Sequence, residues 1–159
     1  LDRVNAIRKI IGDECGISSD MITGFCTETE EEHRETISLM DIVEYDFSYT
    51  FYYSERPGTL AARKYEDDIP LEIKKRRLQE VIDKQRELSL KRNKLDVAKE
   101  FKILVEGASK KSDKDLFGRN SANKVIVFPK EGYKIGQYVN VKVESCNSAT
   151  LLGKAVGLA

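Results

Sequence analysis

The residue types best suited to bind a metal or to carry out catalysis are few in this sequence. The three cysteines, Cys15, Cys26 and Cys146, are widely spaced and form neither a CxxC nor a CxxxCxxC motif, so they predict no metal site and no iron–sulfur cluster. Their odd number argues against a disulfide framework and favours a reducing, cytoplasmic location. The one histidine, His33, lies on the apolar stripe of a predicted helix, which favours packing over catalysis.

Acidic residues cluster in the segment Glu28–Glu32. Such a cluster could bind a metal ion, but Thr29 followed by Glu32 fits a capping box, in which each side chain satisfies a backbone amide at the start of a helix. We therefore expect this segment to begin a helix. No P-loop and no GxGxxG motif is present.

The positive chemical signal lies in the last third of the chain, where basic and amide side chains gather around glycines. Arginine and lysine meet phosphates, and asparagine can reach base edges or the 2′-hydroxyl group, so the pattern favours RNA binding. Ordinary turns have the same composition, and that alternative stays open. The candidate RNA-binding residues are Lys110, Lys111, Arg119, Asn120, Asn123 and Lys124.

The net charge of zero hides an asymmetry along the 159 residues. Residues 1–69 hold 7 Lys and Arg against 16 Asp and Glu, residues 70–95 hold 9 against 4, and residues 96–159 hold 11 against 7. An acidic front and a basic rear suggest modules with different partners, the basic one being the candidate for a polyanion. No apolar run reaches the ~18 residues of a membrane span, so no membrane partner is expected.

The front of the chain alternates helices with strands. The patterns predict a helix over residues 2–15 that stops at Gly16, a strand over 17–26, a helix after Thr29 and a strand over 47–53. This order is typical of parallel strands with crossover helices. Two strands cannot form a stable parallel sheet alone, so we expect either a piece of a larger α/β domain or self-assembly. The start at Leu1 favours the piece.

A polar loop over residues 54–68, with a type II turn at Arg56–Thr59, precedes a long basic helix over 70–93. The charge run at 74–77 is either a solvated helix face or an edge that faces phosphates. From residue 96 the apolar period changes to two, and short strands with glycine turns, including Gly107 and Gly118, indicate a small β-barrel.

Several segments resemble the radical-SAM methylthiotransferases. Residues 20–33 (DMITGFCTETEEEH) are similar to one motif of that family, and residues 47–62, with YSERPGTLAA, are similar to the motif that follows it. Arg56-Pro57 favours the tRNA-modifying branch over the branch that modifies a ribosomal protein. Residues 116–128 and 148–153 resemble a TRAM domain, a small RNA-binding barrel.

The resemblance implies an α/β + β fold. Residues 1–69 would be the last strands and helices of a partial (β/α)6 radical-SAM barrel, residues 70–95 a basic linker helix, and residues 96–156 a TRAM, OB-like β-barrel. The family enzyme uses two [4Fe-4S] clusters, S-adenosylmethionine and an electron donor. It forms a 5′-deoxyadenosyl radical and methylthiolates C2 of isopentenylated adenosine beside the tRNA anticodon.

The resemblance also implies that the strand ends lie beside S-adenosylmethionine. The residues concerned are Ile22, Gly24, Phe25, Phe51, Tyr53 and Ser54. Cys26 and Thr27 replace a proline and a glycine of the family motif, which puts the geometry of that turn in doubt.

This chain lacks the cluster cysteines, so we expect it alone to bind no cofactor and to have no methylthiotransferase activity, while it binds the tRNA anticodon stem–loop. Two other functions stay open. One is a related enzyme that acts on threonylcarbamoyladenosine or on a ribosomal protein, and the other is a stand-alone RNA-binding module.

Overall fold

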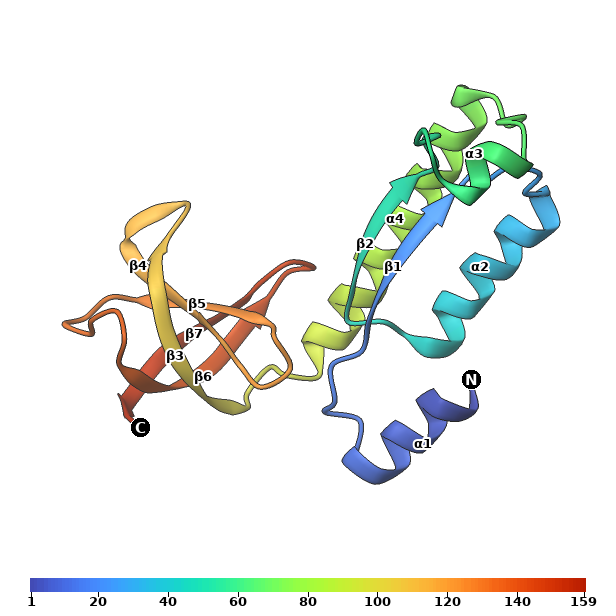
Figure 1. Cartoon of the computed structure of the whole chain (residues 1–159). Coiled ribbons are helices and arrows are strands. Elements are labelled where there is room, and N and C mark those ends of the chain that lie inside the picture. The colour runs from blue at the N-terminus through green and yellow to red at the C-terminus, as the bar shows by residue number, and fades with distance from the viewer. The chain divides into compact units, whose positions relative to one another are not determined.

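The structure is a computed structural model that describes residues 1–159, and it divides into two compact units (Figure 1). One unit comprises residues 18–88, and the other joins residues 1–17 to residues 89–159. Residues 1–17 therefore group with the rear of the chain rather than with the strands that follow them.

The unit of residues 18–88 is built on two parallel strands, β1 (Ser18–Thr23) and β2 (Phe47–Tyr52), which pair from Ser18–Phe47 to Thr23–Tyr52. The crossover between them is the helix α2 (Glu30–Val43). The predicted strand–helix–strand order is thus confirmed, as is the parallel pairing. The sheet contains only these two strands.

The capping box at the start of α2 is also confirmed. The Glu32 amide donates to Thr29 Oγ1 at 3.2 Å, and the Thr29 amide donates to a Glu32 carboxylate oxygen at 2.8 Å. The acidic first turn that could have been a metal site is therefore a helix start, stabilised by the helix dipole.

The long basic helix is α4 (Leu71–Lys94), which covers the sheet together with α2. The core between these elements contains Met21 of β1, Met40 of α2, and Val81 and Leu88 of α4. The predicted loop over 54–68 contains a short helix, α3 (Leu60–Lys64), which the sequence analysis missed. The Thr59 hydroxyl caps this helix by accepting from the Ala62 amide at 3.2 Å.

The rear unit contains a closed five-stranded barrel of strand order β3-β4-β5-β7-β6. Its strands are β3 (Glu100–Ser109), β4 (Ser112–Arg119), β5 (Val125–Pro129), β6 (Tyr138–Cys146) and β7 (Leu151–Leu158). The alternating apolar residues of the sequence point inward, and the fully buried ones include Ile103, Ile126, Phe128, Val139 and Val141. The predicted β-barrel is therefore confirmed.

Two glycines that were predicted to form turns lie inside strands instead. Gly107 lies in β3, where the pairing with β4 shifts register, and Gly118 lies in β4. A Cβ atom on Gly118 would come within 2.2 Å of the Leu104 carbonyl oxygen. Strand interiors use glycine where two backbones approach closely, and this explains the position.

The first helix, α1 (Asp2–Ile11), ends four residues earlier than predicted, at Gly12 with φ 97° rather than at Gly16. Its apolar stripe is not buried, since Ile10 and Ile11 keep 82% and 64% of their surface exposed. The segment after it is fixed to the rear unit, where Arg92 donates to the Asp13 carbonyl at 2.5 Å. No helix of the chain combines the length and the apolarity that a membrane span requires.

Candidate functional site

The carboxyl ends of β1 and β2 lie side by side, as parallel pairing requires. The Tyr53 amide donates to the Thr23 carbonyl at 2.8 Å, so the backbone pairing extends one residue beyond β2. Gly24 then turns the chain with φ 65°, and Thr27 adopts φ 67°. The second value lies in the left-handed region that favours glycine, and this chain adopts it with threonine.

One face of the two-stranded sheet carries apolar side chains that nothing in the structure covers. Ile22 and Phe51 are direct neighbours in the strand register, and they keep 57% and 55% of their surface exposed. Asp20 and the exposed Tyr49 form the pair before them. The structure therefore brings Ile22 and Phe51 together, as the prediction of a shared ligand site requires.

Phe25 and Tyr53 of the predicted set also lie together. Their rings meet edge to face at a centroid distance of 4.9 Å, and Phe25 makes a similar contact with Tyr65 at 5.9 Å. The pKa of Tyr53 is raised chiefly by burial, and the nearby Cys26 thiol and the negative charges of Glu55 and Asp67 raise it further. Ser54 follows in the exposed loop. An apolar, aromatic surface thus surrounds both strand ends.

The space above Gly24 is filled by the protein itself. A Cβ atom there would meet the Lys74 side chain at 2.5 Å, so the missing side chain makes room for α4.

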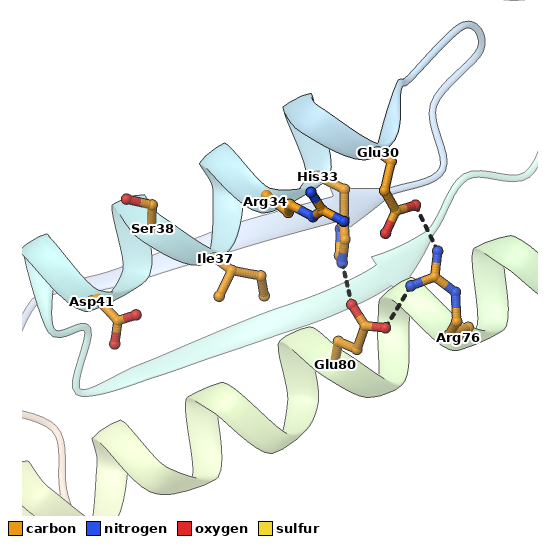
Figure 2. A pocket seen from close by; sticks show the side chains of 8 residues that line it. All are labelled: Glu30, His33, Arg34, Ile37, Ser38, Asp41, Arg76 and Glu80. Atoms are coloured by element: carbon orange, nitrogen blue, oxygen red, sulfur yellow. Dashed lines mark hydrogen bonds and ion pairs between the residues drawn. The ribbon is translucent and has the colours of Figure 1, made fainter.

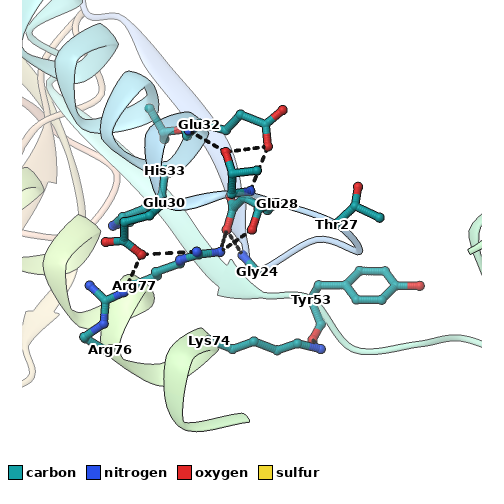
Figure 3. A network of polar contacts seen from close by, with 12 residues as sticks. Gly24, Thr27, Glu28, Glu30, Glu32, His33, Tyr53, Lys74, Arg76 and Arg77 are labelled. Atoms are coloured by element: carbon teal, nitrogen blue, oxygen red, sulfur yellow. Dashed lines mark hydrogen bonds and ion pairs between the residues drawn. The ribbon is translucent and has the colours of Figure 1, made fainter. Parts of the chain in front are cut away.

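The charge run of α4 is not a fully solvated helix face, because two of its four residues, Lys74 and Arg77, are buried. Lys74 ion-pairs with Asp67, and its Nζ donates to the Tyr53 carbonyl at 3.2 Å. Arg77, with 5% of its side chain exposed, donates to the Glu28 carboxylate at 2.7 Å and to the Glu28 carbonyl at 2.9 Å (Figure 3). The same carboxylate accepts from the Gly24 amide at 2.6 Å. α4 therefore holds the turn after β1 and the end of β2.

A second part of this network links α2 and α4. Arg76 contacts Glu30 at 2.7 Å and Glu80 at 2.6 Å, and His33 Nε2 lies 2.7 Å from Glu80. The pKa of Glu30 falls to about 2, chiefly because Arg76 donates a hydrogen bond to it. Burial raises the pKa of Glu80, but hydrogen bonds from His33 and Arg76 outweigh it and lower the value.

An open pocket lies beside this network, between α2 and α4 (Figure 2). Carboxylates and guanidinium groups line it, and three of them, those of Glu30, Arg76 and Glu80, pair with one another. His33 is buried there, as the packing hypothesis expected, although its bond to Glu80 was not foreseen. The pocket therefore has a structural explanation.

The predicted RNA-binding residues fall into two groups. Asn120 is buried, and its Oδ1 accepts from the amides of Ala122 and Lys124 at 3.1 and 3.0 Å, so it shapes the loop between β4 and β5. The Lys124 ammonium lies 2.7 Å from Asp96 with only 10% of the side chain exposed. These two side chains are engaged within the protein.

The other four side chains are exposed to solvent. Lys110 and Lys111 form the tip of the β3–β4 hairpin, and Asn123 lies in the β4–β5 loop with φ 61°. Arg119, at the end of β4, makes a loose ion pair of 3.5 Å with Glu106. These residues can reach a phosphate or a base without disturbing the barrel.

No three His, Cys, Asp or Glu side chains are grouped so that they could hold a metal ion. Cys26 is buried, and Cys15 and Cys146 are partly buried, all with free thiols.

Comparison with known proteins agrees with this architecture. Residues 94–156 match the family model of the TRAM domain. The chain is 62% identical over 154 residues to the tRNA-2-methylthio-N(6)-dimethylallyladenosine synthase of Amoebophilus asiaticus, which covers 97% of this chain and 32% of that protein. It is 54% identical over 155 residues to the synthase of Christiangramia forsetii, covering 98% and 32%. The synthase of Parabacteroides distasonis is 52% identical over 156 residues, covering 98% and 34%.

The closed barrel and the family match together identify residues 94–156 as a TRAM domain. The chain spans about a third of the length of the curated relatives it matches. Over nearly its whole length it corresponds in sequence to the C-terminal portion of these tRNA methylthiotransferases.

Proposed function

We propose that this chain acts as the C-terminal part of a tRNA-2-methylthio-N6-dimethylallyladenosine synthase, an enzyme that adds a methylthio group to dimethylallyladenosine in tRNA. The observation that carries the proposal is an unfinished parallel sheet in a chain that also contains a TRAM domain. The relatives are synthases of this kind and share 52–62% of their residues with this chain over the matched region, which supports the same conclusion.

In this proposal the sheet of β1 and β2 is the last part of a partial (β/α)6 barrel. Two strands with one exposed apolar face leave both outer edges unpaired, and a parallel sheet requires cover on both faces. Further strands would pair with these edges and enclose Ile22 and Phe51. α4 would be the linker helix, and residues 96–156 would bind RNA.

S-adenosylmethionine fits the strand ends of such a barrel, where loops after parallel strands build ligand sites. Ile22, Phe51 and Phe25 offer apolar contact surface, while Gly24, Tyr53 and Ser54 shape the turns around it. When bound, this cofactor would supply the methyl group and the radical chemistry of the reaction. In this proposal the iron–sulfur centres are bound by residues outside this chain.

The TRAM domain would bind the tRNA anticodon stem–loop. Lys110, Lys111 and Arg119 would contact phosphates, and Asn123 would reach a base or a 2′-hydroxyl group. Asn120 and Lys124 would act indirectly, because they hold the β4–β5 loop in shape.

Binding of the chain to a fluorescently labelled anticodon stem–loop tests this part of the proposal. We expect an affinity that falls steeply with salt, because each phosphate contact releases a counterion. Replacing Lys110 and Lys111 with glutamine should weaken binding and reduce the salt slope by about 1.4, at about 0.7 per contact to single-stranded RNA. The chain alone should form no 2-methylthio product. Absent or salt-insensitive binding would contradict the proposal.

A further inference from the structure

The outer surface of the barrel carries a set of side chains that point to a second RNA contact, away from the loops. It lies where β6 runs between β3 and β7, and successive outward residues of β6 are an aromatic ring, an amide and a cation. We call this surface the Tyr138 face. Its residues are Lys102, Leu104, Tyr138, Asn140, Lys142 and Lys154.

Tyr138 is an aromatic residue at the surface of a folded barrel, with half of its surface exposed. Leu104 is its direct neighbour on β3 and is itself 38% exposed, so the ring borders an apolar patch. The Lys102 ammonium lies 4.9 Å from the ring centroid and covers part of the ring. An exposed ring beside a cation can stack a nucleic-acid base while the cation meets the adjoining phosphate.

Two lysines face each other farther along the same surface. Lys142 of β6 and Lys154 of β7 are direct partners in the strand register, and like charges in such positions destabilise a sheet. Neither lysine makes an ion pair, although Glu100 lies opposite Lys142 on β3. The two lysines therefore leave a net positive charge on the Tyr138 face, which a polyanion would neutralise.

Asn140 lies between the ring and the lysines. It is opposite Lys102 in the register, and its side chain makes no hydrogen bond within the protein. A free amide next to a stacking ring can donate to and accept from a base edge, as asparagine does in RNA recognition. Tyr138, Asn140 and Lys142, at every second residue of β6, can thus stack on a base, hydrogen-bond to its edge and pair with a phosphate.

We propose that the Tyr138 face binds an unpaired nucleotide of the RNA substrate, with the base stacked on Tyr138 and its backbone phosphates against Lys142 and Lys154. This inference rests on the proposed function and specifies where the RNA lies on the barrel. The charge on the face favours RNA over a protein partner. The engagement of Asn120 and Lys124 within the protein supports a contact surface beyond the β4–β5 loop.

Equilibrium binding of the full chain to the labelled anticodon stem–loop, with matched variants, tests the proposal. Tyr138→Ala should weaken binding about 5- to 150-fold, the range for loss of one base–aromatic stack of about 1–3 kcal/mol, whereas Tyr138→Phe should retain the affinity. The Lys142→Gln/Lys154→Gln double variant should lower the salt slope by about 1.4. Lys9→Gln/Lys64→Gln removes the same charge from α1 and α3 and should leave the slope unchanged.

All these side chains are exposed, so circular dichroism should show that the variants retain the wild-type fold. Binding by the wild-type chain with an unchanged affinity of Tyr138→Ala would overturn the proposal and leave the proposed function standing. Absence of any wild-type binding would instead overturn both. If Tyr138→Ala kept its RNA affinity but abolished self-association in sedimentation, the face would be a protein interface.

Discussion

The Glu30 carboxylate accepts hydrogen bonds from Arg76 and Arg77, which lower its pKa to about 2. In the unfolded chain the same group has a pKa near 4.5. A lowered folded-state pKa contributes stability that is present above about 4.5 and is lost as pH falls toward 2. The network between α2 and α4 should therefore weaken in acid.

We expect Glu30→Gln to reduce the loss of unfolding free energy between pH 5 and pH 2.5, measured by urea denaturation at several pH values. Glu31→Gln is the matched control, because Glu31 is exposed and its carboxylate makes no ion pair. Equal pH dependence of the two variants would show that Glu30 is not coupled to folding.

Gly24 and Gly58 separate two reasons for keeping a glycine. Both have positive φ, at 65° and 84°, but a Cβ atom on Gly24 would clash with Lys74, whereas one on Gly58 would meet no atom within 4 Å. Alanine in the left-handed region is strained by about 1–2 kcal/mol at either position.

Gly24→Ala should lose about 1–3 kcal/mol more unfolding free energy than Gly58→Ala, because overpacking adds to the backbone strain. Chemical denaturation of the two variants measures the difference. The double variant Gly24→Ala/Lys74→Ala will not test this cleanly, since it also removes the ion pair with Asp67. Equal losses for the two glycines would contradict the contact with Lys74.

At the scale of elements, the buried pair of Arg77 and Glu28 ties α4 to the turn after β1. Removing one partner of a buried pair typically destabilises a protein by about 3–5 kcal/mol, because the other charge remains buried and unpaired. We expect Arg77→Ala to lose free energy of unfolding in that range, whereas Arg86→Ala should stay within about 0.5 kcal/mol, because its pair with Asp83 is exposed.

Hydrogen exchange of the Gly24 amide gives an independent measure of the same link. That amide donates to the carboxylate that Arg77 holds. It should exchange faster in Arg77→Ala and at the wild-type rate in Arg86→Ala. Unchanged protection in Arg77→Ala would show that the ion pair does not position the turn.

Local sequence patterns predicted the elements whose signals are local. The capping box, the parallel strands and the alternating barrel strands need only spacing and residue type, and the structure confirms them. The short helix α3 was missed because its signal, the Thr59 cap, lies inside a polar segment. Gly118 was wrongly predicted to form a turn, because its reason for being glycine is the close approach of a neighbouring strand, which the sequence around it does not show.

The partners of charged residues could not be predicted from sequence in the same way. The run at 74–77 looks solvated because it is highly charged. In the structure Lys74 pairs with Asp67, and Arg77 pairs with Glu28, which is 49 positions away in the sequence. Lys124 likewise meets Asp96 rather than solvent. Among the candidate ligand residues, the strand register places Ile22 beside Phe51, and their role in binding stays a prediction.

At the scale of the whole molecule, the two units differ in how completely their sheets are closed. The sheet of the front unit has two strands and an exposed apolar face, whereas the rear barrel is closed. Of the two units, only the rear one has a closed sheet that encloses its own hydrophobic core. We expect the front unit to gain stability and function within a longer enzyme.

The most direct test is a chimera in which this chain replaces the matching 154 residues of the Amoebophilus asiaticus synthase, to which it is 62% identical. The chimera is expressed in cells that lack their own synthase, and tRNA nucleosides are analysed by mass spectrometry. We predict that 2-methylthio-N6-dimethylallyladenosine appears with the chimera and is absent with this chain alone. A stable, folded chimera that leaves the dimethylallyladenosine unmodified would contradict the account.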